Sequence, residues 1–423
     1  MTSLDVYLHE DRVGRLERLP QARLDFAYEP EWIERGGAPV SLSLPVRAEP
    51  FPDEECRPFF KGLLPEGEFL KSIARSFHVS AENSFTVLSE IGGECAGAIT
   101  LVPPGSTPPF ESDSEPRWLD EAELAELIDE LPSPRLLGDD EGEGGAGFRL
   151  SLAGTRDKLA ILWGEDRVGI THGRPPSTHI VKKPVAELRA MVANESYCLA
   201  LARHAGLSVA EALPLAAGDQ EGLLVRRYDR RREAGGAVRR LHQEDFCQAL
   251  GILPELKYQA EGGPDVAACG ALIRHHAAAP AVDLLAFLDA LLFNLMIGNT
   301  DAHGKNYSLL LDDGGPRLAP LYDLLSARVY WPFERKMAMK YGGEYRADRI
   351  RGRHLDRLAA DLEVSPAVVR RRAGEMAERT LAAAAPARDD LPAPWRGAEL
   401  IEELDSFLVD GADSLRRAAA EPA

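Results

Sequence analysis

The sequence has little cysteine for its length and no cysteine pair at a short, metal-type spacing. Its five cysteines are scattered over 423 residues without a CxxC motif, which argues against zinc sites and a disulfide framework and predicts a reduced, cytoplasmic protein. No apolar run is long enough to cross a membrane, because the most apolar segment, LLAFLDALLFNLMIG, is short and contains Asp289. The N-terminus lacks the basic and apolar regions of a signal peptide. We therefore expect neither secretion nor a membrane span.

Basic residues are outnumbered, and the imbalance is concentrated in one segment. The chain has 68 acidic and 49 basic residues, which gives a formal net charge of −19. Residues 1–110 hold 17 acids and 10 bases, residues 111–147 hold 13 and 2, and residues 148–423 hold 38 and 37, so the three parts carry −7, −11 and −1. A negative excess repels nucleic acid and anionic membrane surfaces. We therefore expect no direct, non-specific binding to DNA.

Composition and residue pattern divide the chain into four parts. With 45% hydrophobic residues in 423, the chain is long enough for two or three domains. The expected parts are a small mixed α/β domain (1–104), an acidic linker with a short amphipathic helix (105–147), a strand-rich lobe (148–235) and a mostly helical lobe (236–423). In the first part we expect a hairpin around Glu10–Asp11 and a strand at VSLSLPV, residues 40–46. The expected fold class is α+β, a two-lobed, protein-kinase-like fold preceded by a small mixed domain.

The segment IGNTDAHGKNYSLLLDDGGPRLAPLYDLLSA, residues 297–327, carries the most informative pattern. Phosphoryl transfer to a hydroxyl needs a carboxylate at the nucleophile and side-chain oxygens that hold magnesium. Asp301 and Asn306 stand five residues apart, which is the interval in the HRDxxxxN loop of protein kinases. YSLLL and PRLAPL are expected to pair around Asp312–Gly315 and so to bring Asn306 close to Asp323. Taken singly, each residue is better explained as a turn or cap residue, but the ordered set favours a phosphotransfer site.

Two weaker patterns lie earlier in the chain. SLAGTRDKLAIL, residues 151–162, puts a small-residue loop between two strand-like runs, as phosphate-binding loops do, although an ordinary hairpin turn explains it equally well. Lys182 in HIVKKP is expected on a strand, as a nucleotide-anchoring lysine would be, with Glu195 on the next helix as its candidate partner. Alternation puts Lys182 and Lys183 on opposite faces of that strand. The alternative is a solvated edge lysine.

Together these motifs resemble the HipA family of serine/threonine kinases, the toxin components of bacterial type II toxin–antitoxin modules. The resemblance covers nearly the whole chain in the same order, and the motifs that carry it are VSLSLPV, FFKGLLPEGE, GGECAGAI, RLSLAGTRDK, HIVKKP, ANESYCLALARHAGL, LVRRYDR, HQEDFCQALG, KYQAEGGP, NTDAHGKNYSLL and LAPLYDLLSA. It implies ATP and Mg²⁺ as cofactors.

The resemblance also implies a role for individual residues. It makes Asp301 the catalytic aspartate, with His303 and Lys305 in the catalytic loop, and it makes Asn306 and Asp323 the magnesium ligands. The residues that it places at ATP are Ser151, Ala153, Gly154, Lys158, Lys182, Arg226, Tyr228 and Asp229. Ser151 is the expected autophosphorylation site, where a phosphate would expel the loop and switch the kinase off.

One position departs from the family pattern. A prominent family member carries Glu where this chain has Arg226, which puts side-chain recognition of adenine in doubt. Asp229 has a second interpretation, as a structural partner of Arg227 or Arg230.

The resemblance implies partners as well. These are a HipB-like helix-turn-helix antitoxin, contact with DNA only through that antitoxin, dimeric assembly through it, and a protein substrate in translation such as a glutamyl-tRNA synthetase. Two other functions stay open. The Asp, Asn and Asp set does not encode the acceptor, so a small-molecule or lipid kinase of similar core is one. A co-repressor scaffold with a dispensable cleft is the other.

Overall fold

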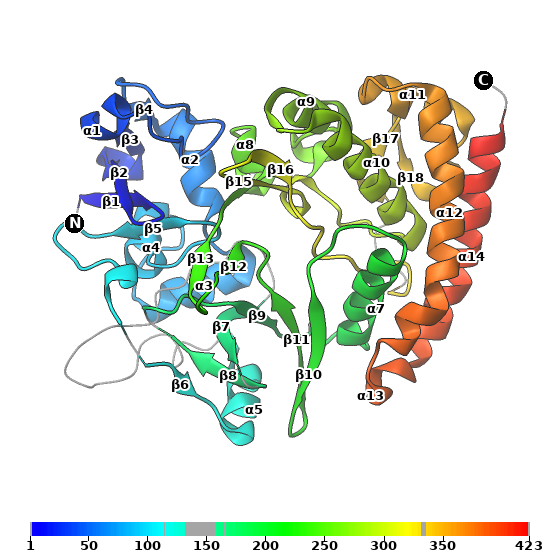
Figure 1. The fold of residues 1–423 in the computed structure, drawn as a ribbon, viewed down its shortest axis with the longest axis horizontal. Helices are drawn as coiled ribbons and strands as arrows, with labels where there is room; N and C mark the ends of the chain where they lie inside the picture. The colour runs from blue at the N-terminus through cyan, green and yellow to red at the C-terminus, as the bar shows by residue number, and fades with distance from the viewer. Residues whose placement is uncertain are drawn as a thin grey trace. The chain divides into compact units, whose positions relative to one another are not determined.

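A computed structural model describes residues 2–113, 115–131, 157–164, 166–171, 173–330 and 336–421 (Figure 1). The chain forms two compact units, residues 1–183 with 215–254 and residues 184–214 with 255–423. It is 43% helical and 24% strand, which confirms the α+β class. The two units cut across the four expected parts. Strands of the expected strand-rich lobe group with the N-terminal domain, and the helix that follows HIVKKP groups with the helical lobe.

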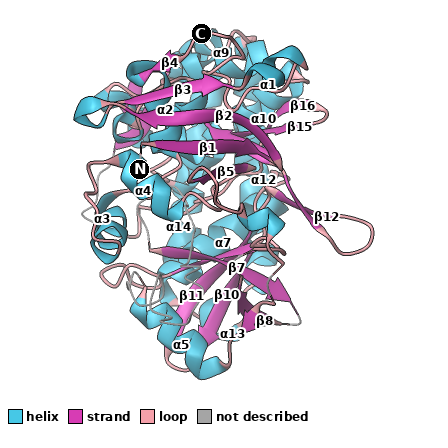
Figure 2. Cartoon of the chain, turned by 90° about the vertical axis from the view of Figure 1, so that its left-hand side faces the viewer, coloured by secondary structure: helices cyan, strands magenta, loops and turns pink. Residues whose placement is uncertain are grey.

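The first unit begins with a five-stranded antiparallel sheet in the order β4-β3-β2-β1-β5 (Figure 2). Its strands are β1 (Ser3–Leu8), β2 (Asp11–Arg18), β3 (Leu24–Tyr28), β4 (Phe51–Pro52) and β5 (Ile99–Val102), and its helices are α1 (Pro30–Glu34), α2 (Asp53–Gly62), α3 (Gly67–Ser76) and α4 (Ser84–Ile91). Leu8 pairs with Asp11, which confirms the expected hairpin.

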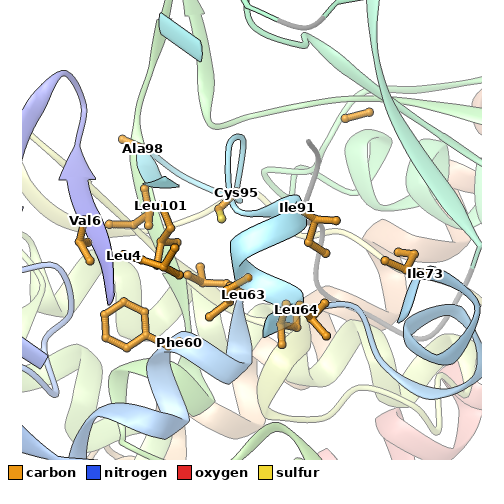
Figure 3. Packing of buried hydrophobic residues seen from close by; sticks show 14 of the residues in the cluster. Leu4, Val6, Phe60, Leu63, Leu64, Ile73, Ile91, Cys95, Ala98 and Leu101 are labelled. Atoms are coloured by element: carbon orange, nitrogen blue, oxygen red, sulfur yellow. The ribbon is translucent and has the colours of Figure 1, made fainter. Parts of the chain in front are cut away.

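The core of this sheet follows the two-residue period of its strands. Leu4 and Val6 of β1 and Leu101 of β5 are fully or almost fully buried, and they lie near Phe60 and Leu63 at the end of α2 (Figure 3). Burying one such side chain stabilises a fold by about 2 kcal/mol.

The expected strand at 40–46 is wrong. Residues 41–44 form a turn, in which Ser41 and Leu44 make an isolated bridge. The Tyr28 hydroxyl closes this turn, because it accepts from Val40 N at 2.9 Å and donates to Leu44 O at 2.6 Å. The buried Glu244 carboxyl group then accepts from the Ser41 hydroxyl and, at 2.9 Å, from Leu42 N.

A second sheet has the order β10-β11-β9-β7-β8-β6. Its strands are β6 (Arg117–Trp118), β7 (Lys158–Gly164), β8 (Arg167–Ile170), β9 (His179–Lys182), β10 (Ala212–Ala217) and β11 (Gln220–Arg226). Helix α5 (Glu121–Glu130), which begins at an Asp120 capping box, packs on β11. The elements β6 and α5 belong to the expected linker, so part of that linker is folded.

The rest of the first unit is short elements, namely β12 (Arg230–Arg232), β13 (Val238–Arg240), β14 (His242–Asp245) and α8 (Phe246–Ala249). The strands β12 and β13 pair as a hairpin.

The second unit is mainly helical. Its elements are α7 (Met191–His204), α9 (Val266–His276), α10 (Pro280–Ile297), β15 (Ser308–Asp312), β16 (Gly315–Leu318), β17 (Lys336–Tyr341), β18 (Glu344–Arg346), α11 (Gly352–Asp361), α12 (Pro366–Asp389), α13 (Ala393–Arg396) and α14 (Glu399–Ala420). Helices α12 and α14 run side by side, and α7 and α10 pack against α12 (Figure 1).

Helix α10 is longer than the apolar segment noted in the sequence. Its 18 residues are long and apolar enough to span a membrane, but 72% of that window is buried inside the structure, as in the core helix of a globular unit. Asp289 within it forms ion pairs of 2.9 Å with Arg372 and Arg379 of α12. The charge that interrupts the apolar run therefore joins two helices.

Candidate active site

The loop that carries Asp301 starts where α10 ends. Gly298 ends the helix with a left-handed φ of 67°. The next residue, Asn299, donates from its side chain to Asn294 Oδ1 at 3.0 Å and to Asp323 O at 3.3 Å. One buried amide thus links the helix end, the Asp301 loop and the Asp323 loop.

Asp301 is exposed and held from two sides. The Tyr258 hydroxyl donates to Oδ1 of the Asp301 carboxylate, and the Asp301 backbone N–H donates to Asn299 Oδ1 at 3.3 Å. An exposed but oriented carboxylate is the arrangement that a group needs to accept a proton from a hydroxyl.

His303, Lys305 and Asn306 are buried just beyond Asp301. The Asn306 amide oxygen accepts from His303 N at 3.1 Å. His303 packs edge-on against the Tyr258 ring, with ring centroids 5.1 Å apart. Burial, together with Lys257 and Lys305, lowers the pKa of His303 to about 3, so its imidazole is neutral.

The expected hairpin is confirmed and joins the Asn306 and Asp323 regions. Strands β15 and β16 pair antiparallel, with Leu309 opposite Leu318 and Asp312 opposite Gly315. The Tyr322 hydroxyl donates to Lys305 O at 2.6 Å and hydrogen-bonds the Ser308 hydroxyl at 2.7 Å. The residues next to Asn306 and Asp323 are therefore tied directly to each other.

Asp323 has a backbone conformation that is uncommon for a residue with a side chain. Its φ is 52°, and such strain gathers at functional sites because the surrounding structure must enforce it. Two bonds of 2.9 Å between Asn194 of α7 and the backbone of Ser326 hold the following residues. The conformation of the loop that carries Asp323 is thus set from α7 as well as from the hairpin.

The donors in this region suit magnesium. Among the residues that the structure describes, no group of three or more His, Cys, Asp or Glu side chains could hold a metal by itself. Asn306 and Asp323 offer an amide oxygen and a carboxylate, and Mg²⁺ is usually held by one or two carboxylates together with phosphates and water. The set therefore fits a metal that arrives with a nucleotide.

The lysines expected at the nucleotide lie in the second sheet. Lys182 is buried on β9, and Lys158, expected in a loop, is the first residue of β7 and directly opposite Lys182. Residues directly opposite in an antiparallel pair project from the same face. The Lys183 ammonium instead donates to the Asp129 and Leu131 carbonyls at the end of α5. Lys182 and Lys183 therefore project in different directions, as expected.

Asp229 is a structural partner of both Arg227 and Arg230. It is buried, pairs with Arg227 at 2.8 Å and Arg230 at 3.1 Å, and accepts from Gly97 N at 2.7 Å. Burial acts to raise its pKa, but the two guanidinium groups hold the pKa well below its usual value. Glu94 pairs with the same two arginines. These contacts account for Asp229 as a structural residue of the first unit.

The other residues expected at the nucleotide differ in exposure, and three of them are not described. Arg226 ends β11 and is exposed, and the Tyr228 hydroxyl donates to Gln243 Oε1. Ser151, Ala153 and Gly154 lie outside the described residues. Glu195 is buried in α7, in the second unit, and its pairing with Lys182 stays a prediction.

Sequence reasoning did not single out three residues that organise the site. They are Asn299, Tyr322 and Tyr258. The first two lie beside Asp301 and Asp323, so a search for polar neighbours of the motif would have found them. Tyr258 is 43 residues from Asp301, and nothing in the local pattern connects the two.

The chain matches known proteins along most of its length. Residues 4–102 match the HipA N-terminal domain and residues 150–385 the HipA-like C-terminal domain. Y4mE of Sinorhizobium fredii, named as a candidate kinase, is 41% identical over 92% of each chain. The serine/threonine-protein kinase toxin HipA of Shewanella oneidensis is 32% identical over 76% of this chain and 74% of its own.

The fold is also similar to that of a solved structure. The match is a chain from the Shewanella oneidensis MR-1 toxin–antitoxin complex of HipA, HipB and operator DNA. It has a TM-score of 0.83 at 28% identity and covers 98% of this chain and 99% of that chain.

Proposed function

Because this chain belongs to the HipA family of kinases, we propose that it transfers phosphate from ATP to a serine or threonine hydroxyl of a protein. The observation that carries the proposal is the exposed Asp301 carboxylate, oriented by Tyr258 beside a loop pair that presents Asn306 and Asp323. The small-molecule or lipid kinase and the scaffold have no comparable observation in their favour.

Each residue has a defined role in this proposal. Asp301 accepts the proton of the attacking hydroxyl. Asn306 and Asp323 would hold Mg²⁺, which would supply positive charge to offset that of the phosphates. The Lys305 ammonium neutralises charge on the transferred group. Ser151 is the proposed autophosphorylation site.

The lysine pair supports a phosphate at the second sheet. Lys158 and Lys182 stand directly opposite each other on β7 and β9, so their side chains project from the same face of the sheet. Two ammonium groups on one face could both contact the phosphates of a nucleotide. Arg226 and Tyr228 are the proposed contacts of the remainder of the nucleotide.

The biological role proposed is that of a growth-arresting toxin. A HipB-like helix-turn-helix antitoxin would hold the kinase and contact DNA, and the similarity to HipA from a complex with HipB and operator DNA supports this. Dimeric assembly through the antitoxin is part of the same proposal. The net charge of −19 agrees with indirect contact with DNA. The proposed target is a translation protein such as a glutamyl-tRNA synthetase.

The test compares the wild type with Asp301→Gln and with Asp312→Asn, a control in the hairpin turn. We expect the purified wild type and the control to label themselves and a lysate protein with radioactive ATP, and Asp301→Gln to lose at least about a thousandfold in rate. Expression of the wild type or the control should arrest growth, and expression of Asp301→Gln should not. Labelling of a metabolite and no protein would favour the small-molecule kinase, and arrest by Asp301→Gln would favour the scaffold.

A further inference from the structure

A cavity of about 390 Å³ lies in the second unit, beside the two loops of the active site. Thr300, which lines it, immediately precedes Asp301, and Arg328, which also lines it, follows Asp323 by five residues. Helix α14 supplies another wall. The cavity is therefore built partly from the backbone that positions the proposed catalytic groups.

Most of the cavity wall is apolar. The apolar side chains that line it include Met296, Met337, Ile350, Phe407 and Leu415. Pockets for small ligands have volumes of about 300–1,000 Å³, with mainly apolar walls and a few polar groups. At 390 Å³ this cavity is at the small end of that range, which suits a molecule of one or two rings and is too small for a nucleoside triphosphate.

The polar groups of the lining favour a cation. Two carboxylates, Asp348 and Asp410, line the cavity with one guanidinium, that of Arg328. Asp348 pairs with Arg346 at 3.1 Å, and Arg328 lies over the Phe407 ring at 4.7 Å. The exposed Asp410 carboxylate makes no ion pair or hydrogen bond with any residue that the structure describes. An ammonium group is the complement of that carboxylate.

The cavity wall is also where the two active-site loops are joined. Ala327 N donates to Gly298 O at 3.2 Å, and both residues line the cavity. The adjacent Asn299 amide reaches Asp323 O. A ligand that packs against Gly298 and Ala327 would restrain both loops at their junction.

We propose that this cavity binds a small organic cation with an apolar body of one or two rings, and that binding restrains the loop that carries Asp301. This inference goes beyond the proposed kinase function and does not depend on it, because neither binding nor loop restraint requires phosphoryl transfer.

Binding is tested on the full chain with 4-phenylbutylamine as the probe, followed by calorimetry. We expect saturable binding about fivefold tighter than that of the neutral 4-phenylbutanol, as for an exposed ion pair. Asp410→Asn should remove this preference, and Ser414→Trp should abolish binding by filling the cavity. Asp413→Asn, an exposed residue of the same helix that does not line the cavity, should bind like the wild type.

Several results would contradict the proposal. No saturable binding to the wild type, or equal binding of the amine and the alcohol, would overturn the proposal. Undiminished binding by Ser414→Trp with cooperative unfolding would do the same, and Ser414→Met replaces that variant if it fails to fold. For the restraint, amide hydrogen exchange at Asn299 and Ala327 should slow at least twofold on saturation with the amine. Unchanged exchange at both amides would refute it.

Discussion

At the residue scale, the buried charges of the first unit are organised around Asp229. Its carboxylate pairs with Arg227 and Arg230, and the same arginines reach Glu94. Removing one member of a buried ion pair leaves its partner charged and without compensation, at a cost of about 3–5 kcal/mol.

We therefore expect Asp229→Asn to lower the free energy of unfolding by about 3 kcal/mol, because two buried guanidinium groups lose their counter-charge. Urea denaturation of the first unit measures it. Asp219→Asn, at an exposed turn residue, should change stability by less than about 0.5 kcal/mol. Equal stability of the two variants would mean that Asp229 is not a structural residue.

Glu244 makes stability depend on pH. Burial raises the pKa of its carboxyl to about 8 in the folded protein, although the bonds from Ser41 and Leu42 act to lower it, against 4.5 for an ordinary glutamate. The folded state thus binds the proton more tightly than the unfolded state, so this contribution is complete below pH 4.5 and is lost as the pH rises towards 8.

Glu244→Gln cannot titrate and should escape this loss. We expect its melting temperature, relative to that of the wild type, to rise by a few degrees between pH 5 and pH 8. Glu82→Gln, which alters an exposed carboxylate, should follow the wild type throughout. A constant difference between Glu244→Gln and the wild type would contradict the prediction.

Tyr258 orients the proposed catalytic carboxylate through one hydrogen bond. Tyr258→Phe keeps the ring against His303 but removes the donor, and a net loss of about 1 kcal/mol corresponds to a rate about fivefold lower. The kcat for autophosphorylation should fall by that factor, with the KM for ATP unchanged. A change in KM alone would place Tyr258 at the nucleotide instead.

At the element scale, α14 lies close to α10 at Gly411. A Cβ atom at Gly411 would lie 2.8 Å from Met296 O, whereas one at Gly374 of α12 would meet nothing within 4 Å. Alanine is favoured over glycine within a helix by about 1 kcal/mol. We expect Gly374→Ala to stabilise the protein and Gly411→Ala to destabilise it, as measured by thermal unfolding. If both variants shifted stability in the same direction, α14 would be able to move away from α10 and accommodate a side chain at Gly411.

The same scale explains which elements the sequence could predict. The β15–β16 hairpin was predictable because its turn residues and both strands are local. The turn at 41–44 was not predictable, because the alternation of Val, Ser and Leu at 40–46 fits a strand as well as a turn. The polar groups of this turn bond Tyr28 and Glu244, and Glu244 is more than 200 residues away in the sequence. In the active site, the spacing of Asp301 and Asn306 was visible, but the bond from Tyr258 depends on tertiary folding.

At the scale of the whole molecule, the acidic connector is more than a spacer. Its helix α5 buries Leu124, Leu127 and Ile128 in the core of the first unit, while its acids face outward. We expect Leu127→Ala to destabilise that unit by about 3 kcal/mol and Glu126→Gln, on the exposed side, to be neutral in chemical denaturation. Equal effects of the two changes would show that the packing of α5 does not stabilise the first unit.

Lys183 joins α5 to the residue before β7, and this link determines what a cut in the chain between them would do. The Lys183 ammonium holds the end of α5 at the Asp129 and Leu131 carbonyls, and the Lys183 backbone N–H donates to Asp157 O just before β7. Leu131 and Asp157 are thus bonded to the same lysine. Cleavage of the chain between α5 and β7 should therefore yield two fragments that co-purify. The protein is thus suited to being split into two chains that assemble when both are present.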